Sequence, residues 1–306
     1  MTVARLSVLL LCVAHLGAQP SGRINGVIDK LQQGEPVFGI FSEDRSPTNA
    51  AALNDSALDF IIIDMEHRPL DFESLRQFLQ GMLSRNDHTS SNPLRPPALP
   101  LVRLPQNGSE QLQFLIKQAL DVGAYGLVLP HIESREQALS AVRAARYFQK
   151  SGASDFDPPG LRGVSPAVAA RYWGLSIDEY MEKADLWPLD PSGEVLLIML
   201  IESREGAENI DAILEAPGIG GIFIGTWDLA TSLGFPRDSE APQVTEAIAK
   251  ILAASKRAGI PCGITTTINT VDQHLNQGFR ILTVGSDVGV SPAAAVVLEH
   301  LQDRGR

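Results

Sequence analysis

The sequence predicts a single (β/α)₈ barrel, an α/β fold in which parallel strands alternate with helices around one core. Short apolar runs recur along the chain, and most are apolar throughout, as in parallel strands that are buried on both faces. Between them lie stretches with apolar residues at three- and four-residue spacing, which is typical of helices with one buried side. A doubly wound open sheet is the alternative, but no G-x-G-x-x-G motif follows the first strand.

The alternation has a defined order along the chain. The predicted strands are Val37–Ser42, Phe60–Glu66, Leu99–Leu104, Gly126–His131, Val195–Ile201, Gly221–Gly225, Pro261–Thr265 and Arg280–Gly285. The predicted helices are Phe72–Met82, Glu110–Val122, Arg135–Tyr147, Ala207–Leu214, Val244–Ala258, Val271–Asn276 and Ala293–Leu301. Ser84–Pro100 and Gln149–Pro166 are rich in turn residues and are predicted loop insertions, which in a barrel shape the active-site mouth or an oligomer contact.

The first residues predict export. Leu6–Leu16 is an apolar run of signal-peptide length after a weakly basic start, and Gly17-Ala18 supplies small residues for cleavage. We therefore expect a signal peptide over residues 1–18, a barrel over 19–306, and a secreted or periplasmic protein. A cytoplasmic location is the alternative if this segment is not a signal. The apolar run is too short to span a bilayer, which needs about 20 residues.

Charge and cysteine content exclude several classes of function. The chain has 25 basic and 36 acidic residues, so its net charge is −11. This balance disfavours nucleic acid and anionic membranes as partners, because both require clustered Lys and Arg. Once a signal peptide is removed, Cys262 is the one remaining cysteine, and its apolar neighbours predict a buried, unreactive thiol.

Polar residues stand at the ends of several predicted strands, where (β/α)₈ enzymes hold their catalytic groups. They are Asp64-Met-Glu66-His67, Arg103, Glu202 and Asp228. Taken singly, each carboxylate could be a helix cap and the arginine a structural ion pair. Together they would face one mouth, where two carboxylates suit a hard or borderline divalent ion such as Mg²⁺ or Mn²⁺.

The same residue types predict chemistry on a 2-oxo acid. A metal bound to the carboxylate and ketone of such an acid is a Lewis acid that stabilises an enolate. A nearby guanidinium adds positive charge where the oxyanion develops, and a histidine can move the proton. His131, at the end of another strand, is a further candidate for contact with substrate or for proton transfer.

From about Ile24 onward the chain resembles the HpcH/HpaI aldolases, the metal-dependent (class II) pyruvate aldolases that include 4-hydroxy-2-oxoheptanedioate aldolase. The matching segments are Phe60-Ile-Ile-Ile-Asp-Met-Glu-His67, Leu101-Val-Arg-Leu-Pro105, Leu120-Asp-Val-Gly-Ala124, Leu161-Arg-Gly-Val164, Ile201-Glu-Ser-Arg-Glu205 and Gly221-Ile-Phe-Ile-Gly-Thr-Trp-Asp-Leu229. The resemblance implies a barrel of the phosphoenolpyruvate/pyruvate type, small 2-oxo acid and aldehyde substrates, and a homo-oligomer, trimeric or hexameric, with the C-terminal helix near Pro292–Leu301 packed on a neighbour.

The resemblance also implies roles for individual residues. His67 would be the general base, Asp121 would hydrogen-bond His67, and Arg103 would stabilise the enolate. Glu202 and Asp228 would ligate the metal, Mg²⁺ or Mn²⁺ first and Co²⁺ as a further option. The backbone around Thr226, Trp227 and Asp228, at a helix N-terminus, would bind the substrate carboxylate.

The substrate side of the site departs from the family pattern. Met65 stands where glycine is common, and Leu200 where a substrate-contacting glutamine is common. Trp227 lies beside a metal ligand, and Phe41 replaces a tryptophan frequent at the mouth. Two alternatives to the aldolase therefore stay open: a non-catalytic or altered-specificity barrel that binds metal and 2-oxo acids, and an acyl-CoA ester lyase. The latter lacks a visible Lys/Arg cluster for the CoA phosphates.

Overall fold

The strands form a closed barrel in the computed structural model of the chain, which describes residues 22–84, 92–105, 113–153, 156–287 and 299. Parallel pairing runs through β1 (Val37–Ser42), β2 (Phe60–Asp64), β3 (Leu99–Arg103), β4 (Gly126–Leu129), β6 (Val195–Ile201), β7 (Gly221–Ile224), β8 (Cys262–Thr265) and β9 (Ile281–Ser286). β4 pairs with β6 and β9 with β1, so the ring is complete and the open-sheet alternative is wrong.

Every strand predicted from the sequence is present, with bounds that agree within two residues. Most strand positions are buried, which explains why the runs are apolar throughout. One short strand was missed: β5 (Leu186–Trp187) pairs with the start of β6 at Leu186 and Val195. Two residues carry too little periodicity to be recognised in a sequence.

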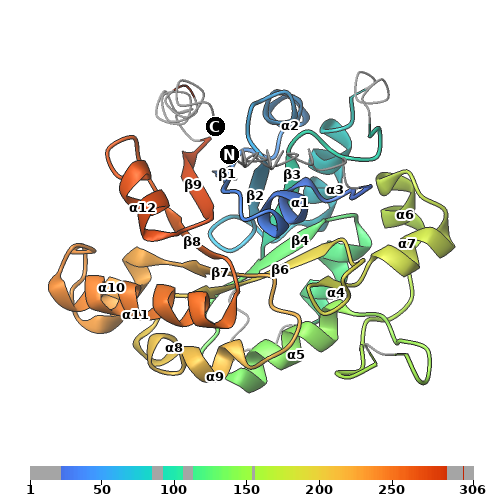
Figure 1. The fold of residues 1–306 in the computed structure, drawn as a ribbon. Helices are drawn as coiled ribbons and strands as arrows, with labels where there is room; N and C mark the ends of the chain where they lie inside the picture. Colours follow the sequence, from blue (N-terminus) through green and yellow to red (C-terminus); the bar gives the residue numbers. More distant parts are fainter. Residues whose placement is uncertain (1–21, 85–91, 106–112, 154–155, 288–298, 300–306) are drawn as a thin grey trace, which may run out of the picture.

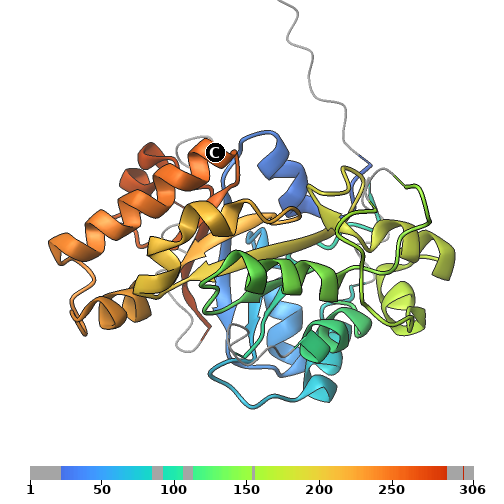
Figure 2. The same cartoon turned by 90° about the horizontal axis from the view of Figure 1, so that it is seen from below.

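The helices lie around the outside of the barrel, as the two views in Figures 1 and 2 show. The helices that the sequence predicts are α3 (Phe72–Gly81), α4 (Gln113–Asp121), α5 (Arg135–Ala145), α11 (Pro242–Ala258) and α12 (Val271–Gln277), and the predicted Ala207–Leu214 divides into α8 (Arg204–Glu208) and α9 (Ile210–Leu214). The helices that it misses are α1 (Gly26–Gln32), α2 (Pro47–Asn54), α6 (Ala167–Trp173), α7 (Ile177–Lys183) and α10 (Thr226–Leu233). All five span only two turns or so, too short for a clear periodic pattern.

The described parts of the two predicted loop insertions begin where helices end, at the N-terminal side of the barrel. Ser84–Pro100 connects α3 to β3, and Gln149–Pro166 follows α5 on the way to β6. Helices of a (β/α)₈ barrel run back to the N-terminal ends of the strands, so both insertions emerge at that face. The described parts of the insertions therefore lie away from the mouth of their own barrel, and their expected role at an active-site mouth or an oligomer contact stays a prediction. Leu99 and Pro100 also belong to β3 rather than to a loop.

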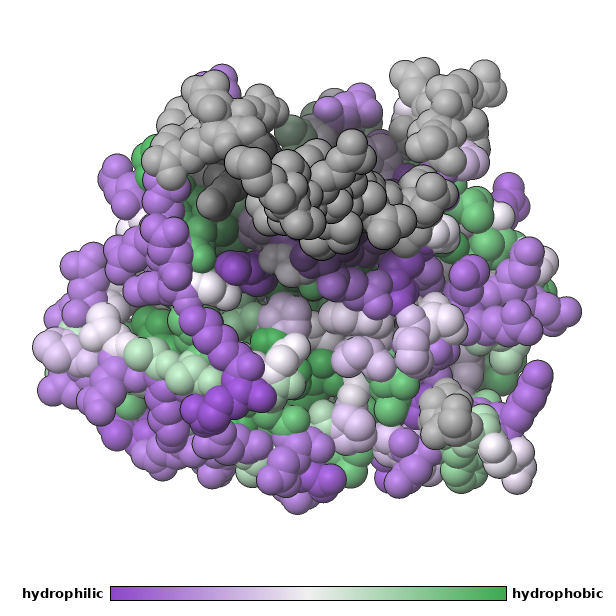
Figure 3. Space-filling model, viewed as in Figure 1, coloured by the Kyte–Doolittle hydropathy of each residue, from purple (hydrophilic) through white to green (hydrophobic). Residues whose placement is uncertain are grey.

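The structure also bears on the predicted state of Cys262 and on the character of the protein surface. Cys262 is buried, and burial raises the pKa of its thiol to about 12, which confirms an unreactive cysteine. Hydrophilic side chains cover much of the face in Figure 3, and apolar ones surface mainly in patches between them. Among the described residues, no helix is both long and apolar enough to cross a membrane.

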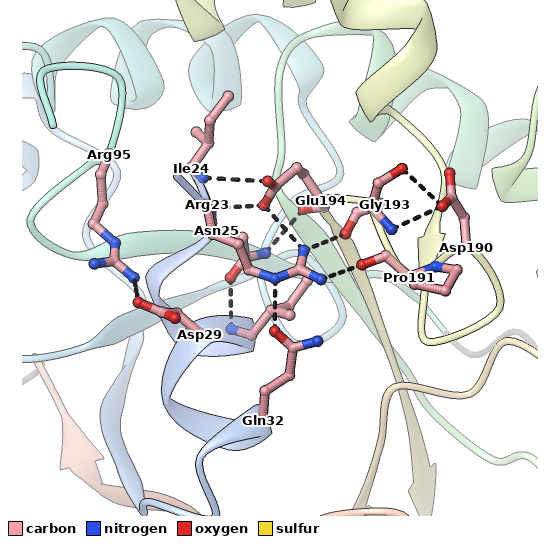
Figure 4. A network of polar contacts seen from close by, with 12 residues as sticks. Arg23, Ile24, Asn25, Asp29, Gln32, Arg95, Asp190, Pro191, Gly193 and Glu194 are labelled. Atoms are coloured by element: carbon pink, nitrogen blue, oxygen red, sulfur yellow. Dashed lines mark hydrogen bonds and ion pairs between the residues drawn. The ribbon is translucent and has the colours of Figure 1, made fainter. Parts of the chain in front are cut away.

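A buried polar network closes the N-terminal end of the barrel (Figure 4). The Glu194 carboxylate, which is 2% exposed, accepts hydrogen bonds from the backbone N–H groups of Ile24 at 3.3 Å and Asn25 at 2.9 Å. The Arg23 guanidinium lies 3.6 Å from it and donates to the carbonyl oxygens of Gly193 and Pro191. The segment before α1 is thereby attached to the turn between β5 and β6.

We expect Glu194→Ala to destabilise the protein by about 3 kcal/mol, because it leaves the buried N–H groups of Ile24 and Asn25 without an acceptor and removes the negative charge beside Arg23. Chemical denaturation of the two proteins measures the difference. Asp211→Ala is the matched control, since Asp211 and Arg257 form an exposed ion pair whose loss should cost less than about 1 kcal/mol. Equal effects of the two substitutions would contradict the structural role of the network.

Candidate metal and active site

The C-terminal ends of β2, β3, β4, β6 and β7 bring most of the predicted site residues to one mouth. Asp64 and Arg103 are direct neighbours in the register of β2 and β3. The Arg103 guanidinium donates from Nε and one Nη to the two oxygens of Asp64, at 3.0 and 2.9 Å. Its face lies 4.7 Å from the centre of the Phe41 ring. This fork and the ring beneath it fix the plane of the arginine.

Glu66 and His67 follow β2 in a short turn that Asp64 stabilises. One oxygen of Asp64 accepts the backbone N–H groups of Glu66 at 3.0 Å and His67 at 3.4 Å. The Glu66 carboxylate lies 3.2 Å from a terminal nitrogen of Arg103 and 3.6 Å from Nε2 of His67. The His67 side chain is 65% exposed, so solutes can reach it. Met65, by contrast, is buried in the core and does not face the mouth.

Glu202 follows β6 directly and is only 3% exposed. Its Oε1 accepts the backbone N–H of His131 at 3.0 Å and lies 3.5 Å from Nε2 of the same residue. Gly225, at the end of β7, leaves the space that this carboxylate occupies. A Cβ at position 225 would stand 2.4 Å from Oε2 and 2.8 Å from Cβ of Glu202.

Burial and neighbouring negative charges raise the pKa of Glu202 to about 8, with Glu66 and Asp228 as the neighbours. Burial also raises the pKa of Glu66, against the opposing effect of Arg103. Ligand atoms of Glu66, His131 and Glu202 all lie within 4.8 Å of one another. Such a set of carboxylates and an imidazole fits a divalent cation, which would offset the repulsion among the carboxylates.

This pKa predicts how stability depends on pH. Glu202 binds its proton more tightly in the folded protein than in the unfolded chain, where its pKa is near 4.5. Its contribution is fully present below about pH 4.5 and is lost as the pH rises through about 8. Without added metal, we expect the contribution of Glu202 to the free energy of unfolding to fall between pH 5 and 8, by at most a few kcal/mol.

Melting temperatures with EDTA and with Mn²⁺ test this expectation. Mn²⁺ should restore stability mainly at the higher pH, because it binds the ionised carboxylate. Glu202→Gln should flatten the pH dependence and remove the effect of Mn²⁺. Equal pH dependence of the wild type and Glu202→Gln in EDTA would contradict the assignment.

Asp228 lies in the first turn of α10, near enough to Glu202 to affect its pKa. It is not the helix cap, because Gly225 occupies that position and offers no side chain to the first N–H groups of the helix. The backbone N–H groups of Thr226, Trp227 and Asp228 therefore have no side-chain cap and are available to an anion. Trp227 is 63% exposed, so its bulk faces solvent rather than the core.

Phe41 and Leu200 line the inner part of the barrel below these groups. Phe41 packs edge-to-face on Phe223 with ring centres 6.3 Å apart. Leu200 is buried on β6, two residues before Glu202 and hence on the same side of the strand. The floor beneath the polar groups is therefore apolar.

Asp121 does not join this site. It is the last residue of α4, which ends at the N-terminal side of the barrel, away from His67. Its Oδ1 accepts hydrogen bonds from Nε and a terminal nitrogen of Arg162, at 3.2 and 2.9 Å. Arg162 is fully buried and also contacts the hydroxyl of Tyr180. The hydrogen bond between His67 and Asp121 that the resemblance implies is not made within this chain.

For three residues of the site the sequence predicts no role or only a general one. Asp64 interrupts an apolar strand directly opposite Arg103, a signal that becomes readable once the register is known. Glu66 stands beside His67 but carries no separate motif. His131 follows Pro130 and adopts a left-handed backbone with φ of 52°, which no sequence pattern reveals.

Comparisons with known proteins agree with this geometry. The sequence model of the HpcH/HpaI aldolase/citrate lyase family matches residues 37–293. The chain is 33% identical over 265 residues to a hydroxypyruvate/pyruvate aldolase of Paraburkholderia phytofirmans, covering 86% of this chain and 92% of that one. It is 32% identical to a 5-keto-4-deoxy-D-glucarate aldolase of Escherichia fergusonii, covering 83% and 87%.

A solved structure is similar over almost the full length. An HpcH/HpaI aldolase/citrate lyase family protein from Burkholderia cenocepacia superposes with a TM-score of 0.71 at 30% identity, covering 92% of this chain and 98% of that chain. The family model, the relatives and the solved structure thus each cover most of the barrel, including the strands that form its mouth. On this basis the protein is a member of the HpcH/HpaI aldolase/citrate lyase family.

Proposed function

We propose that the protein is a metal-dependent aldolase that forms or cleaves a carbon–carbon bond of a 4-hydroxy-2-oxo acid through a pyruvate enolate. The observation that carries this proposal is the cluster of Glu66, His131 and Glu202 beside Arg103 at the barrel mouth. The names of the relatives support the substrate class, since they include aldolases of pyruvate and hydroxypyruvate. The natural aldehyde is left open.

Glu202 and Asp228 would hold the ion, with Mg²⁺ and Mn²⁺ as first candidates. When bound, such an ion polarises the ketone of a 2-oxo acid and offsets negative charge on the enolate oxygen. The fit rests on donor chemistry, because a buried carboxylate with a raised pKa lies among other carboxylates and an imidazole. The residues below act alongside that ion.

Arg103 would stabilise the enolate oxygen. Its two hydrogen bonds to Asp64 engage two of its five N–H groups, and the nitrogen that lies 3.2 Å from Glu66 keeps N–H groups that could reach a substrate. The uncapped N–H groups at the start of α10 would bind the substrate carboxylate. A substrate held between them would place its methyl carbon within reach of the exposed His67.

His67 would move the proton. In the direction of bond formation, its imidazole would take a proton from the methyl group of pyruvate, the resulting enolate would attack the aldehyde carbon, and the imidazolium would return the proton to the new alkoxide oxygen. In cleavage, the imidazole would take the proton of the 4-hydroxyl group as the carbon–carbon bond breaks to release the aldehyde, and the imidazolium would then protonate the enolate carbon to give pyruvate. The Glu66 carboxylate of the cluster lies 3.6 Å from Nε2 of His67.

The role of Asp121 depends on assembly. Since His67 and Asp121 lie at opposite ends of one barrel, they can pair only between two copies of the chain. This requirement is consistent with the predicted homo-oligomer, which remains a proposal. Export also stays a prediction, because residues 1–18 lie outside the described residues, as does most of the predicted helix Ala293–Leu301.

The test is direct. Purified protein with Mg²⁺ or Mn²⁺, pyruvate and a panel of aldehydes should yield aldol products detectable by chromatography and NMR. His67→Ala should lower kcat by at least about 100-fold while leaving metal affinity nearly unchanged, and Glu202→Gln should lower both. A variant as active as wild type at either position would overturn the proposal.

The second candidate function is a barrel that binds metal and a 2-oxo acid without catalysis. Leu200 and Trp227 make the substrate side more apolar than in the family pattern, and Leu200 is buried under the metal ligands. Binding of metal and pyruvate, measured by calorimetry, without any product across the aldehyde panel would favour a non-catalytic barrel.

A further inference from the structure

We propose that His131 supplies an imidazole nitrogen to the metal held by Glu202, and so makes the site prefer Mn²⁺ and Co²⁺ to Mg²⁺. This inference rests on the proposed metal-dependent function and concerns its metal specificity. The residue lies just beyond β4, on the opposite side of Glu202 from Gly225 in the strand order β4–β6–β7. It therefore approaches Glu202 from a different strand than Asp228 does.

The distances suit a shared ion. Nε2 of His131 is 3.5 Å from Oε1 of Glu202, and both lie within 4.8 Å of a carboxylate oxygen of Glu66. Nitrogen and oxygen ligands lie about 2.1 Å from a transition-metal ion, so two ligands of one ion are roughly 3 to 4 Å apart. The 3.5 Å between Nε2 of His131 and Oε1 of Glu202 lies within this range. The His131 ring is 29% exposed and so can be reached from solvent.

The backbone at His131 supports a functional placement. Its φ of 52° lies in the left-handed region, which is uncommon for residues other than glycine. The same conformation directs the backbone N–H of His131 to Oε1 of Glu202, at 3.0 Å. Main chain and ring of one residue thus converge on one carboxylate oxygen. Strained conformations of this kind concentrate at sites where they orient a functional group.

The ring could instead be a simple hydrogen-bond partner of Glu202, and metal selectivity separates the two roles. Imidazole ligands favour Mn²⁺, Co²⁺ and Zn²⁺ over Mg²⁺, which prefers oxygen ligands and retains its water. If His131 is a ligand, its removal should weaken the binding of the transition metals selectively. If it only orients Glu202, its removal should weaken all ions alike.

The test compares wild type, His131→Asn and Glu202→Gln by calorimetric titration with Mg²⁺, Mn²⁺ and Co²⁺. Asparagine tolerates a left-handed backbone, so this variant removes the ring without adding strain. We expect His131→Asn to weaken Mn²⁺ and Co²⁺ binding by about tenfold or more and to change Mg²⁺ binding by less than about threefold. Pulsed EPR of the Mn²⁺-loaded protein should show coupling to a directly bound ¹⁴N nucleus in wild type and none in the variant.

The outcomes are distinguishable. Equal weakening of all three ions, unchanged affinities, or a ¹⁴N signal that persists in His131→Asn would overturn the role of His131 while leaving the metal site in place. A wild-type protein that binds none of the ions, or a Glu202→Gln variant that binds them as well as wild type, would overturn the proposed metal-dependent function itself.

Discussion

Gly225→Ala should abolish metal binding in a protein that still folds. The added Cβ would stand 2.4 Å from Oε2 and 2.8 Å from Cβ of Glu202, closer than atoms of packed side chains approach. The φ of Gly225 is −82°, so alanine meets no backbone penalty there, and the effect comes from space alone. Glu202 would have to leave the position in which it accepts the N–H of His131.

We expect the affinity for Mn²⁺ to fall by at least about 100-fold, and aldol activity at a fixed Mn²⁺ concentration near the wild-type Kd to fall in parallel, because a ligand displaced by an ångström or more no longer completes the coordination sphere. Calorimetry measures the first effect, and steady-state kinetics at that Mn²⁺ concentration the second. The melting temperature in EDTA should change little, since relieving the crowded carboxylates offsets part of the steric cost.

Gly163→Ala is the matched control. Its Cβ would meet only the Lys117 side chain, at 3.9 Å, and the residue has no left-handed backbone. Metal affinity within twofold of wild type is expected for this variant. If Gly225→Ala bound Mn²⁺ equally well, Glu202 would not hold the ion in the orientation seen here, and the metal site would need different ligands.

The sequence predicted the barrel well because a closed parallel sheet leaves a strong local signal. Strands such as β6 are apolar at every position, and each is separated from the next by at least one helix. Short elements escaped prediction for the same physical reason. The helix α10 spans Thr226–Leu233 and is too brief to show a periodic pattern, yet it supplies the uncapped N–H groups at the mouth.

The sequence predicts those site residues that stand at the ends of strands. Arg103 and Glu202 reach the mouth because they end β3 or follow β6 directly. The sequence could not reveal that Asp121 pairs with Arg162, since that contact depends on the path of the chain between α5 and β6. Nor could it reveal His131 as a neighbour of Glu202, because the contact requires the left-handed turn after Pro130. Local pattern thus predicts which residues stand at the mouth, and tertiary contacts decide which of them meet.

Arg103→Lys should lower kcat by about 100-fold while changing the KM for pyruvate only a few-fold. Lysine keeps the positive charge but loses the fork that holds both oxygens of Asp64, at 3.0 and 2.9 Å. A point charge on a flexible stem cannot direct two N–H groups at a developing oxyanion, and the loss of one such donor typically costs about 100-fold or more in kcat. An interaction made mainly in the transition state lowers kcat rather than raising KM.

A second substitution tests how much the Phe41 ring, which lies under the Arg103 guanidinium, contributes to its position. Phe41→Leu leaves the guanidinium and its pairing with Asp64 intact but removes the ring beneath it, so a smaller loss, of about tenfold or less, is expected. Arg257→Lys, in an exposed ion pair, should have no effect on either constant. Steady-state kinetics on the three variants measure kcat and KM. If Arg103→Lys retained kcat within about threefold, positive charge alone would stabilise the oxyanion, and the paired hydrogen bonds to Asp64 would stabilise the fold rather than the transition state.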